Sequence, residues 1–487
     1  MNFIMDDLKK LNPGSLWSYF HQICKIPRPS KHEGPVSQFI ISFARDLGLE
    51  FLCDSVGNIL IKKSAYSGCE SSQVIVLQSH LDMVCEKKAS HCFDFEKDSI
   101  IPIVDNGWVR TNGTTLGADN GIGVAAMMAI LSDKDLIHGP LECLFTVEEE
   151  FGMTGARGLM PDFLSGKILL NLDSEDDGEI FVGCAGGIDT IGELSVDFDD
   201  TPLGSFAINI SVSGLSGGHS GDDIDKGRAN SIKILSRLLK IVSYFDLRIS
   251  DFHGGNLNNA IPREASALVV IQGIQKEKFI GLLNQFIFDI KLEYVLTDPN
   301  IKIDFSSSTL PQHVMTVESQ QKLICILNAC PYGVIEMSPR IKNLVETSTN
   351  LASVKIVSDT VVISTSQRSE LESRKLFASQ MVSSVFELAG CNVKYSEGYP
   401  GWVYKSESYA HDVVKNSYES LFGIKPLTKT IHAGLECGFF SAKYPDMDMV
   451  SFGPTIKNAH TPDEKILISS VEKFWIHLID VLKTFTS

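Results

Sequence analysis

Three consecutive glutamates, Glu148–Glu150, follow directly on the largely apolar run Leu141–Val147. An apolar run bounded by turn residues, here including Gly152, is typical of a buried strand. Like charges oppose one another's ionisation, so three adjacent carboxylates are costly to bring together unless positive charge neutralises them. Taken alone, the three acids are equally well explained as a solvated acidic turn, since Glu prefers the protein surface. Other apolar runs of this chain end in metal-binding residue types as well, which favours a cation.

Two further apolar runs end in this way. Gln73–His80 leads into His80-Leu81-Asp82, and Lys167–Leu172 leads into Asp173. Residues two apart in extended chain face the same way, so the Asp82 carboxylate can brace the ring of a metal-binding His80. A single His-x-Asp is a weak signal. In open α/β sheets, however, ligands bind at the edge formed by the carboxyl ends of the strands, where all these residues are expected.

The segment Gly113–Leu131 is a glycine-rich loop followed by a strongly apolar helix, with Asp119 at the junction. Helix capping and metal binding are the two interpretations of Asp119. Neither the dinucleotide nor the Walker glycine pattern is present. The turn-rich Asn458–Pro462 follows the strand-like Asp448–Ser451 and supplies a second histidine, His460. Two histidines and several carboxylates without cysteine are typical of a catalytic zinc site, and so many ligands suit two ions that share one carboxylate.

Composition limits the class of protein. The 487 residues predict about three domain-sized units, and 44% hydrophobic with 21% charged residues indicate a globular chain. The net charge of −17 argues against nucleic acid or an anionic membrane as the main partner. No stretch approaches the roughly 20 apolar residues of a membrane span, and the first residues lack the apolar core of a signal peptide. Eleven scattered cysteines without a Cys-x-x-Cys pair indicate reduced thiols and a cytoplasmic protein.

Periodicity predicts the elements that must position these residues. Helices are expected at Leu16–Cys24, Val36–Leu47 and Leu467–Thr484, and a hairpin over Phe51–Lys62 with its turn at Val56–Asn58. The segment between about residues 187 and 398 differs, because its strands alternate and its helices are amphipathic. Examples are Phe206–Ser213, Ser231–Val242 and Glu277–Ile290.

Because His460 lies beyond this segment, we expect residues 1–187 and 399–487 to form one discontinuous catalytic domain. Residues 188–398 would be an inserted domain. The order strand, helix, two strands, helix, strand fits residues 205–306, and most of it fits residues 318–398 again. The insertion is therefore predicted to have two similar halves. The glycine-rich loop Ile431–Gly438 is placed in the catalytic domain, where its His432 and Glu436 are candidate substrate contacts without an assigned role.

The order of the motifs resembles the co-catalytic zinc peptidases related to aminoacylase and carboxypeptidase G. The segments SHLDMVCEK, GLSGGHSGDD and NAHTPDE together resemble one branch, the aminoacyl-histidine dipeptidases. The resemblance covers nearly the whole chain and rests on five separated motifs in order. It implies an α/β fold, in which a zinc-peptidase catalytic domain with a mixed central sheet flanked by helices carries an inserted α+β lid domain that closes over the substrate. Glu148 stands where the family commonly has Asp.

The resemblance implies a role for each candidate metal ligand. Asp119 would bridge two divalent ions, most simply Zn²⁺, with Co²⁺ or Mn²⁺ as alternatives. His80 and Asp173 would complete one coordination shell, and Glu150 and His460 would complete the other.

It also implies the residues that act on substrate. Glu149 would be the general base that takes a proton from the metal-bridging water and passes it to the leaving amine. Asp82 would orient the ligating histidine beside it. His219 would stabilise the oxyanion and Asn259 would help to hold the substrate, while Arg368, if not a solvated surface residue, would clamp the terminal carboxylate of a dipeptide.

Adjacent residues diverge on a regular strand, so the turn at Gly152 is expected to direct both Glu149 and Glu150 towards the site. The expected function is hydrolysis of dipeptides with a free amino terminus, and the branch resemblance adds a preference for Xaa-His, including β-alanyl-histidine. One alternative is an amidase or deacylase that acts on N-acyl amino acids through the same site. Another is a binding protein on a hydrolase scaffold, which the intact Glu149 argues against. Relatives use a lid-mediated dimer, which favours a homodimer, whereas a duplicated lid could supply His219 within a single chain.

Overall fold

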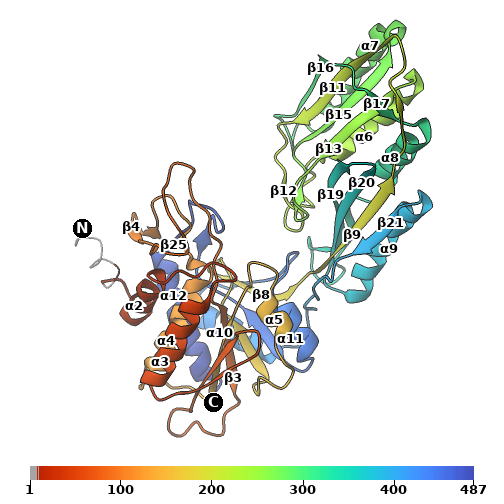
Figure 1. Ribbon diagram of the computed structural model, residues 1–487. Coiled ribbons are helices and arrows are strands. Elements are labelled where there is room, and N and C mark those ends of the chain that lie inside the picture. Colours follow the sequence, from red (N-terminus) through yellow and green to blue (C-terminus); the bar gives the residue numbers. More distant parts are fainter. Residues whose placement is uncertain (1–7, 9, 487) are drawn as a thin grey trace. The chain divides into compact units, whose positions relative to one another are not determined.

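The computed structural model describes Leu8 and residues 10–486. The chain divides into two compact units, whose elements are labelled in Figure 1. Unit 1 comprises Met1–Gly183, Trp402–Thr430 and Leu435–Ser487, and unit 2 comprises Cys184–Gly401 and Ile431–Gly434. The expected boundaries, 187/188 and 398/399, lie close to these. Ile431–Gly434 differs, because it groups with unit 2 and not with the catalytic domain in which the sequence analysis placed it.

Unit 1 is built on an eight-stranded mixed sheet in the order β1-β2-β6-β3-β7-β23-β8-β22. Its central strands β6, β3, β7 and β23 run parallel, whereas β1 with β2, β2 with β6, and β23 with β8 pair antiparallel. All residues of β3, β6 and β7 are buried, as apolar runs without alternation predict. The strands are β1 (Glu50–Cys53), β2 (Ile59–Lys63), β3 (Ile75–His80), β6 (Leu141–Thr146), β7 (Ile168–Asn171), β8 (Glu179–Cys184), β22 (Leu427–Ile431) and β23 (Asp448–Ser451).

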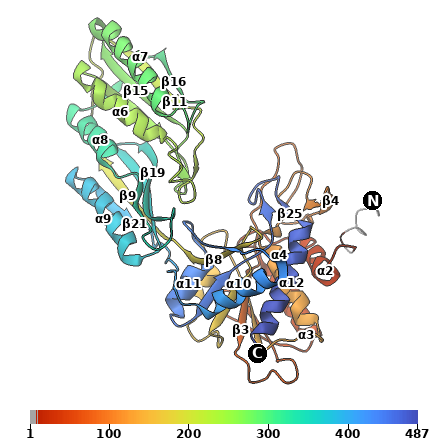
Figure 2. The ribbon, with the colours of Figure 1, turned by 180° about the vertical axis from the view of Figure 1, so that it is seen from behind.

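Helices flank this sheet. The apolar helix α4 packs against β3 and α2, and α10 packs against β23 and α12, beside which it lies in Figure 2. The helices are α2 (Gly14–Cys24), α3 (Gly34–Asp46), α4 (Ala118–Ser132), α5 (Thr154–Gly158), α10 (Tyr409–Phe422), α11 (Glu436–Lys443) and α12 (Ile468–Thr484). A four-stranded sheet has the order β24-β25-β5-β4, with β24 (Ile456–Lys457), β25 (Lys465–Leu467), β5 (Trp108–Arg110) and β4 (Ile103–Asp105). The helices and the hairpin expected in this unit are therefore confirmed.

Unit 2 has a nine-stranded sheet in the order β16-β11-β15-β13-β19-β20-β9-β21, with β18 also paired to β19. Its strands are β9 (Gly186–Ser195), β11 (Ser205–Ser213), β13 (Arg248–Gly254), β15 (Ala265–Gln272), β16 (Lys302–Ser308), β18 (Gly333–Met337), β19 (Val345–Val357), β20 (Thr360–Ser369) and β21 (Asn392–Tyr395). The helices are α6 (Ser231–Val242), α7 (Lys276–Glu293), α8 (Val317–Ala329) and α9 (Glu372–Leu388), with 3-10 turns η1 (Ser243–Phe245) and η2 (Gly273–Gln275). Two short pairs complete the unit, β10 (Phe198–Asp200) with β17 (His313–Met315) and β12 (Gly218–His219) with β14 (Ala260–Ile261).

The unit 2 sheet consists of two halves that meet where β13 pairs with β19. In the first half the chain order β11, α6, β13, β15, α7, β16 gives the strand order β16-β11-β15-β13. The second half consists of β9, α8, β19, β20, α9 and β21 in chain order. Read from the opposite edge of the sheet, its strand order is β21-β9-β20-β19, which matches that of the first half. The expected repeat is thus present as a topology. The sequence pattern missed that β9 precedes the first half along the chain.

No helix among the described residues is long and apolar enough to cross a bilayer.

A buried histidine makes the stability of unit 1 depend on pH. His477 is 3% exposed, and its Nε2–H donates to Val414 O at 2.8 Å. Its ring packs against Tyr418, Phe422 and Phe452. Burial lowers the pKa of His477 to about 4. In the unfolded chain the pKa of His477 is about 6.5. Between pH 6.5 and pH 4 the unfolded chain therefore binds a proton at His477 that the folded unit does not bind. The stability of the folded unit consequently falls as the pH falls through this window.

We expect wild-type unit 1 to lose about 2 kcal/mol more stability between pH 7 and pH 5 than the His477→Phe variant, which has no proton to bind at this position. All four tryptophans, Trp17, Trp108, Trp402 and Trp475, belong to unit 1, so denaturant unfolding followed by tryptophan fluorescence reports this unit alone. Equal losses in the two proteins would refute the assignment to His477.

Candidate active site

The carboxyl ends of the parallel strands of unit 1 lie level with one another. His80, the last residue of β3, pairs with Thr146, the last residue of β6, and Gln78 pairs with Asn171, the last residue of β7. The chain that leaves each strand therefore carries its polar side chains to the same edge of the sheet.

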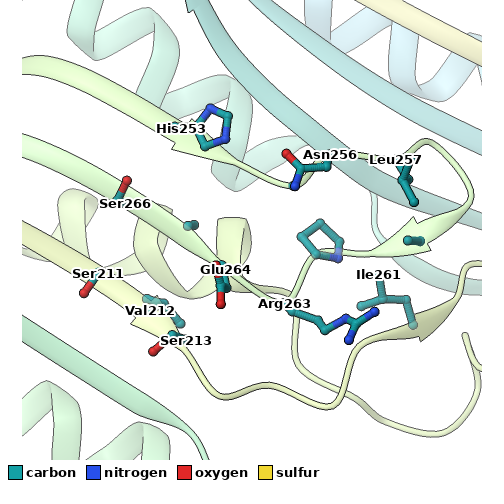
Figure 3. Close-up of a pocket in the computed structure, with 14 residues that line it drawn as sticks. Ser211, Val212, Ser213, His253, Asn256, Leu257, Ile261, Arg263, Glu264 and Ser266 are labelled. Atoms are coloured by element: carbon teal, nitrogen blue, oxygen red, sulfur yellow. The ribbon is translucent and has the colours of Figure 1, made fainter. Parts of the chain in front are cut away.

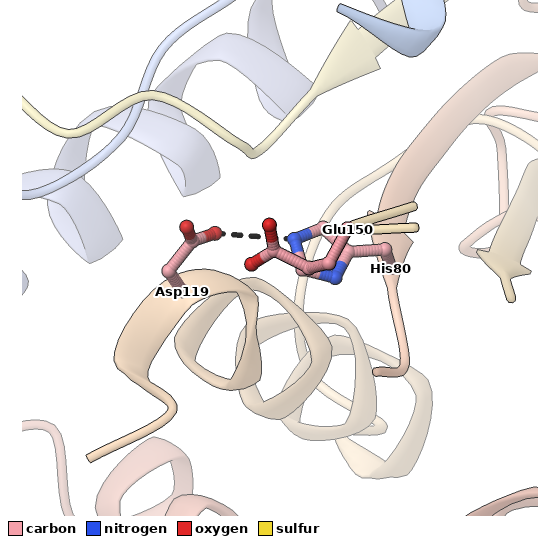
Figure 4. A group of neighbouring side chains, drawn as sticks. All are labelled: His80, Asp119 and Glu150. Atoms are coloured by element: carbon pink, nitrogen blue, oxygen red, sulfur yellow. Dashed lines mark hydrogen bonds and ion pairs between the residues drawn. The ribbon is translucent and has the colours of Figure 1, made fainter. Parts of the chain in front are cut away.

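At this edge Asp119 faces two histidines, one at each carboxylate oxygen. His80 Nε2 lies 3.1 Å from Asp119 Oδ1, and His460 Nε2 lies 3.1 Å from Asp119 Oδ2. Asp173 Oδ1 is 3.5 Å from His80 Nε2, and Glu150 Oε1 is 3.1 Å from His460 Nε2. We call these five residues the His–carboxylate cluster. Figure 4 shows Asp119, His80 and Glu150, whose possible ligand atoms all lie within 4.8 Å of one another.

Asp119 does not cap helix α4. Asp119 has the non-helical angles φ −80° and ψ 112° at the kinked start of the helix, two residues after Gly117 with its φ of +68°. Its side-chain partners are the two histidines. The capping interpretation is therefore wrong, and the helix serves to hold Asp119 at the edge of the sheet.

Glu149 and Glu150 are directed to the site by the carboxylate of Asp82. Strand β6 ends at Thr146, and Glu148 already has a left-handed conformation with φ of +50°. Asp82 Oδ1 then accepts the Glu149 N–H at 3.0 Å, and Asp82 Oδ2 accepts the Glu150 N–H at 3.1 Å. The turn was expected at Gly152, but it begins earlier, at Glu148. It depends on Asp82, a residue far away in the sequence.

Asp82 also braces the ring of His80. The Asp82 side chain is fully buried, its Oδ1 lies 3.3 Å from His80 Nδ1, and Ser30 Oγ donates to its Oδ2 at 2.8 Å. Burial raises the pKa of Asp82, but the contacts with His80, Ser30 and the Glu149 N–H together hold the pKa below the usual value. An ionised carboxylate at Nδ1 leaves Nε2 facing the cluster, which is the orientation a ligating imidazole needs.

The cluster carries an excess of buried negative charge. Burial raises the pKa of Glu149 well above its usual value, with partial relief from His80, and burial likewise raises the pKa of Glu150 and Asp173. Hydrogen bonds to Asp119 and Glu150 raise the pKa of His460 to about 11. The strongest electrostatic neighbours of these carboxyl groups are the two histidines and one another. Imidazole nitrogens and carboxylates around such a charge excess fit divalent cations of the zinc type.

In unit 2 the structure brings His219, Asn259 and Arg368 together. Strand β12, which ends at His219, pairs with β14, and the Ser220 N–H donates to Asn259 O at 2.8 Å. Arg368 lies near the end of β20, where its Nη1 donates to Tyr399 Oη at 2.7 Å and its Nη2 lies 3.4 Å from His219 Nε2. We call His219, Asn259 and Arg368 the unit 2 cluster.

Arg368 is not a solvated surface residue. It is 5% exposed, no carboxylate among the described residues lies within ion-pair distance of it, and its Nε has no hydrogen-bond partner in the described part of the chain. His219 Nε2 lies 3.4 Å from Nη2 of Arg368, a group that can only donate, while His219 Nδ1 lies 3.4 Å from Asp222 Oδ2 and near the N–H groups of Gly221 and Asp222. A guanidinium and an imidazole thus lie side by side, and this arrangement suits an anionic oxygen.

The two candidate contacts of the loop Ile431–Gly438 belong to different units. His432, in unit 2, has its Nε2 2.7 Å from Ser348 Oγ, and burial lowers the pKa of His432 to about 3. Glu436, in unit 1, accepts hydrogen bonds from Gln78 Nε2 at 2.6 Å and Thr146 Oγ1 at 2.8 Å, and burial raises its pKa to about 8. At neutral pH His432 is therefore uncharged.

A cavity of about 480 Å³ in unit 2 does not compete with these clusters. It lies beside β11, β13 and β15, and Figure 3 shows Ser211, His253, Ser266 and Arg263 among its lining residues. None of the candidate site residues lines it.

Sequence reasoning missed two buried charged residues, Arg28 and Glu464, which bind the backbone beside the His–carboxylate cluster. Glu464 lies within the segment NAHTPDE and Arg28 within the proline-rich IPRPS. For Glu464 the only available signal was its place in NAHTPDE, a segment already selected for His460, and for Arg28 no signal was available.

Comparison with known proteins shows the family of the chain. The family described as "Peptidase family M20/M25/M40" matches residues 76–483. The cytosol non-specific dipeptidase of Escherichia coli (strain K12) is 42% identical over 480 residues, which are 98% of this chain and 99% of that protein. The crystal structure of aminoacylhistidine dipeptidase from Vibrio alginolyticus is 42% identical with a TM-score of 0.88 and covers 98% of both chains.

Aminopeptidase PepT from Bacillus cereus, 17% identical with a TM-score of 0.58 over 98% of this chain and 100% of that one, shares the fold. The expected α/β peptidase fold is confirmed by these likenesses over nearly the full length. The chain therefore belongs to the peptidase family M20/M25/M40 and is a metallopeptidase, a hydrolase that acts on peptide bonds.

Proposed function

We propose that this protein is a cytoplasmic di-zinc dipeptidase that hydrolyses Xaa-His dipeptides, including β-alanyl-histidine, with Glu149 as its general base. The observation that carries the proposal is Asp119, whose two carboxylate oxygens each face a different histidine at 3.1 Å. A carboxylate shared in this way is what a two-metal site requires. The pairs His80 with Asp173 and His460 with Glu150 would complete the two sets of ligands.

The named relatives support a peptide substrate and the cytoplasmic location. The Escherichia coli relative is called a cytosol non-specific dipeptidase, and the Vibrio alginolyticus relative an aminoacylhistidine dipeptidase. Both names favour dipeptides over N-acyl amino acids, and they differ in the breadth of specificity at equal identity. We follow the narrower name, because the motifs that first indicated the branch lie in both units.

Two divalent cations, when bound, supply Lewis acidity that activates a water molecule and polarises the scissile carbonyl. Glu149 is placed to take the proton from the attacking water, because its backbone is fixed by Asp82 while its carboxylate is left out of the close contacts of the His–carboxylate cluster. Burial raises the pKa of Glu149 above its usual value, which favours acceptance of the proton from water before it is passed to the leaving amine.

The unit 2 cluster supplies the groups that recognise the rest of the substrate. Arg368 is buried without an ion-pair partner among the described residues, so its guanidinium suits the terminal carboxylate of a dipeptide. His219 is assigned to the oxyanion, since its side chain is about one-third exposed beside the Arg368 guanidinium and its imidazole can donate to an anionic oxygen. The exposed Asn259, tied to the neighbouring Ser220 through its carbonyl, adds an amide that helps to hold the substrate.

Hydrolysis assays on protein stripped with chelator and reloaded with zinc test this function. The panel comprises β-alanyl-histidine, α-dipeptides with and without a terminal histidine, and N-acetyl amino acids. We expect zinc-restored cleavage of Xaa-His dipeptides and no cleavage of acetylated substrates. Equal cleavage of all dipeptides would contradict the proposed preference for Xaa-His and indicate broad dipeptide specificity. Cleavage of acetylated substrates alone would identify a deacylase. Light scattering after size exclusion tests the homodimer that the resemblance implies.

A further inference from the structure

The backbone N–H and the backbone carbonyl of Gly117 each form a hydrogen bond with a buried charged side chain. The Gly117 N–H donates to Glu464 Oε2 at 2.9 Å, and the Gly117 carbonyl accepts a hydrogen bond from Arg28 Nη2. Glu464 and Arg28 are each 2% exposed. Gly117 lies two residues before Asp119, so the chain that carries the shared carboxylate is held from two sides.

Glu464 accepts four consecutive backbone N–H groups. Its Oε2 accepts those of Leu116 at 2.7 Å and Gly117 at 2.9 Å, and its Oε1 accepts those of Ala118 at 2.7 Å and Asp119 at 3.3 Å. The loop needs such an acceptor, because buried backbone N–H groups without a partner are costly and these residues precede the regular part of helix α4. The carboxylate therefore fixes the path of the loop up to Asp119 itself.

Arg28 ties the same loop to the end of strand β3. Its Nη1 donates to Leu81 O at 2.9 Å and to Asp82 O at 2.7 Å, while Nη2 reaches Gly117. The contact is so close that a Cβ on Gly117 would lie 2.5 Å from Nη2, and one on Gly121 would lie 2.7 Å from it. These two positions require glycine for the guanidinium to fit.

The chain positions of the two residues connect three segments of the His–carboxylate cluster. Glu464 stands four residues after His460 and directly before β25, which pairs with β5. Its carboxylate thus fixes the Asp119 loop against the loop that carries His460. Arg28 fixes the Asp119 loop against the strand end that carries His80. Neither side chain belongs to the proposed ligands.

We propose that Arg28 and Glu464 are positioning residues that hold the three ligand-bearing segments in their metal-binding arrangement before any metal arrives. This inference rests on the metal centre proposed above. Groups that orient metal ligands in this way typically change metal affinity by about 10- to 100-fold when they are altered. A preformed centre would bind zinc without having to order the Asp119 loop.

Glu464→Gln is the informative change, because glutamine keeps the size of the side chain. Its amide offers one acceptor oxygen and turns an NH₂ donor towards backbone N–H groups that need an acceptor. We expect zinc affinity, measured by competition with a chromophoric chelator, to fall about 10- to 100-fold.

Glu142→Gln is the matched control. Glu142 is also 2% exposed and lies in unit 1, where it accepts the N–H groups of Ser165 and Gly166 at 2.9 and 3.1 Å, with Ser165 Oγ at 2.7 Å. It holds a loop away from the cluster. This variant is expected to lose thermal stability as Glu464→Gln does but to keep wild-type zinc affinity.

Wild-type zinc affinity in Glu464→Gln, or an equal loss in both variants, would overturn the positioning role while leaving the metal centre itself intact. Failure of the wild-type protein to bind zinc would instead overturn the proposed function. Hydrogen exchange on the metal-free wild-type protein gives a test that needs no variant. The amides of Leu116–Asp119 are expected to stay protected after chelation, and exchange at unprotected rates would refute preformation.

Discussion

The Glu149→Gln enzyme is expected to bind zinc normally and to turn over dipeptides about 10²- to 10⁴-fold more slowly than the wild type. Glutamine retains the shape of the side chain and the backbone N–H bond to Asp82, but it cannot accept a proton from water. Zinc content should be unchanged, because the close contacts of the His–carboxylate cluster join His80, Asp119 and Glu150 without Glu149. Steady-state hydrolysis and metal analysis on the same preparation measure both properties.

Glu148→Gln is the matched control, since it removes the neighbouring negative charge from the same turn. The Glu148 N–H donates to Glu33 Oε1 at 3.0 Å, a bond that the substitution keeps, and its side chain has no proposed role. This variant is expected to retain near-normal kcat. Near-normal turnover by Glu149→Gln would exclude Glu149 as the general base. Loss of zinc from the Glu149→Gln variant would instead make Glu149 a metal ligand.

Local periodicity was sufficient to predict the elements that position the site. Helix α6 was predicted at its observed bounds, Ser231–Val242, because its apolar residues recur with a helical period over its whole length. The apolar runs ending at His80 and near Asp173 are central parallel strands. Such strands end at a common sheet edge, so their terminal side chains converge without any further information.

The details that depend on distant residues escaped prediction. The direction of Glu149 and Glu150 is set by Asp82, which no local turn pattern reveals. Arg368 lies near the end of a strand whose polar residues give no sign of burial, yet it is enclosed beside Tyr399. In each case the deciding contact joins residues far apart in the chain. The same holds for Glu464, which differs from a surface acid only through the loop that it binds.

His219→Ala is expected to lower kcat by about 10²- to 10³-fold with a much smaller change in KM. Negative charge develops on the carbonyl oxygen only as the tetrahedral state forms, so a donor aimed at that oxygen acts mainly in the transition state. The Ser220 N–H bond to Asn259 is kept, because it does not involve the imidazole, whereas the Gly221 and Asp222 N–H groups lose their contact with Nδ1. Comparison of kcat and KM for β-alanyl-histidine separates the two effects.

His253→Ala serves as the control, because His253 is an exposed histidine of the same unit and makes no contact with the unit 2 cluster among the contacts of the described residues. It should leave both constants unchanged. A rise in KM alone in His219→Ala would make His219 a ground-state binder like Arg368, whose loss should raise KM through the substrate carboxylate. Arg368 Nη2 and His219 Nε2 lie 3.4 Å apart, so a double variant is also informative. If they act on different substrate oxygens at different stages, the His219 effect on kcat should persist when Arg368 is already replaced.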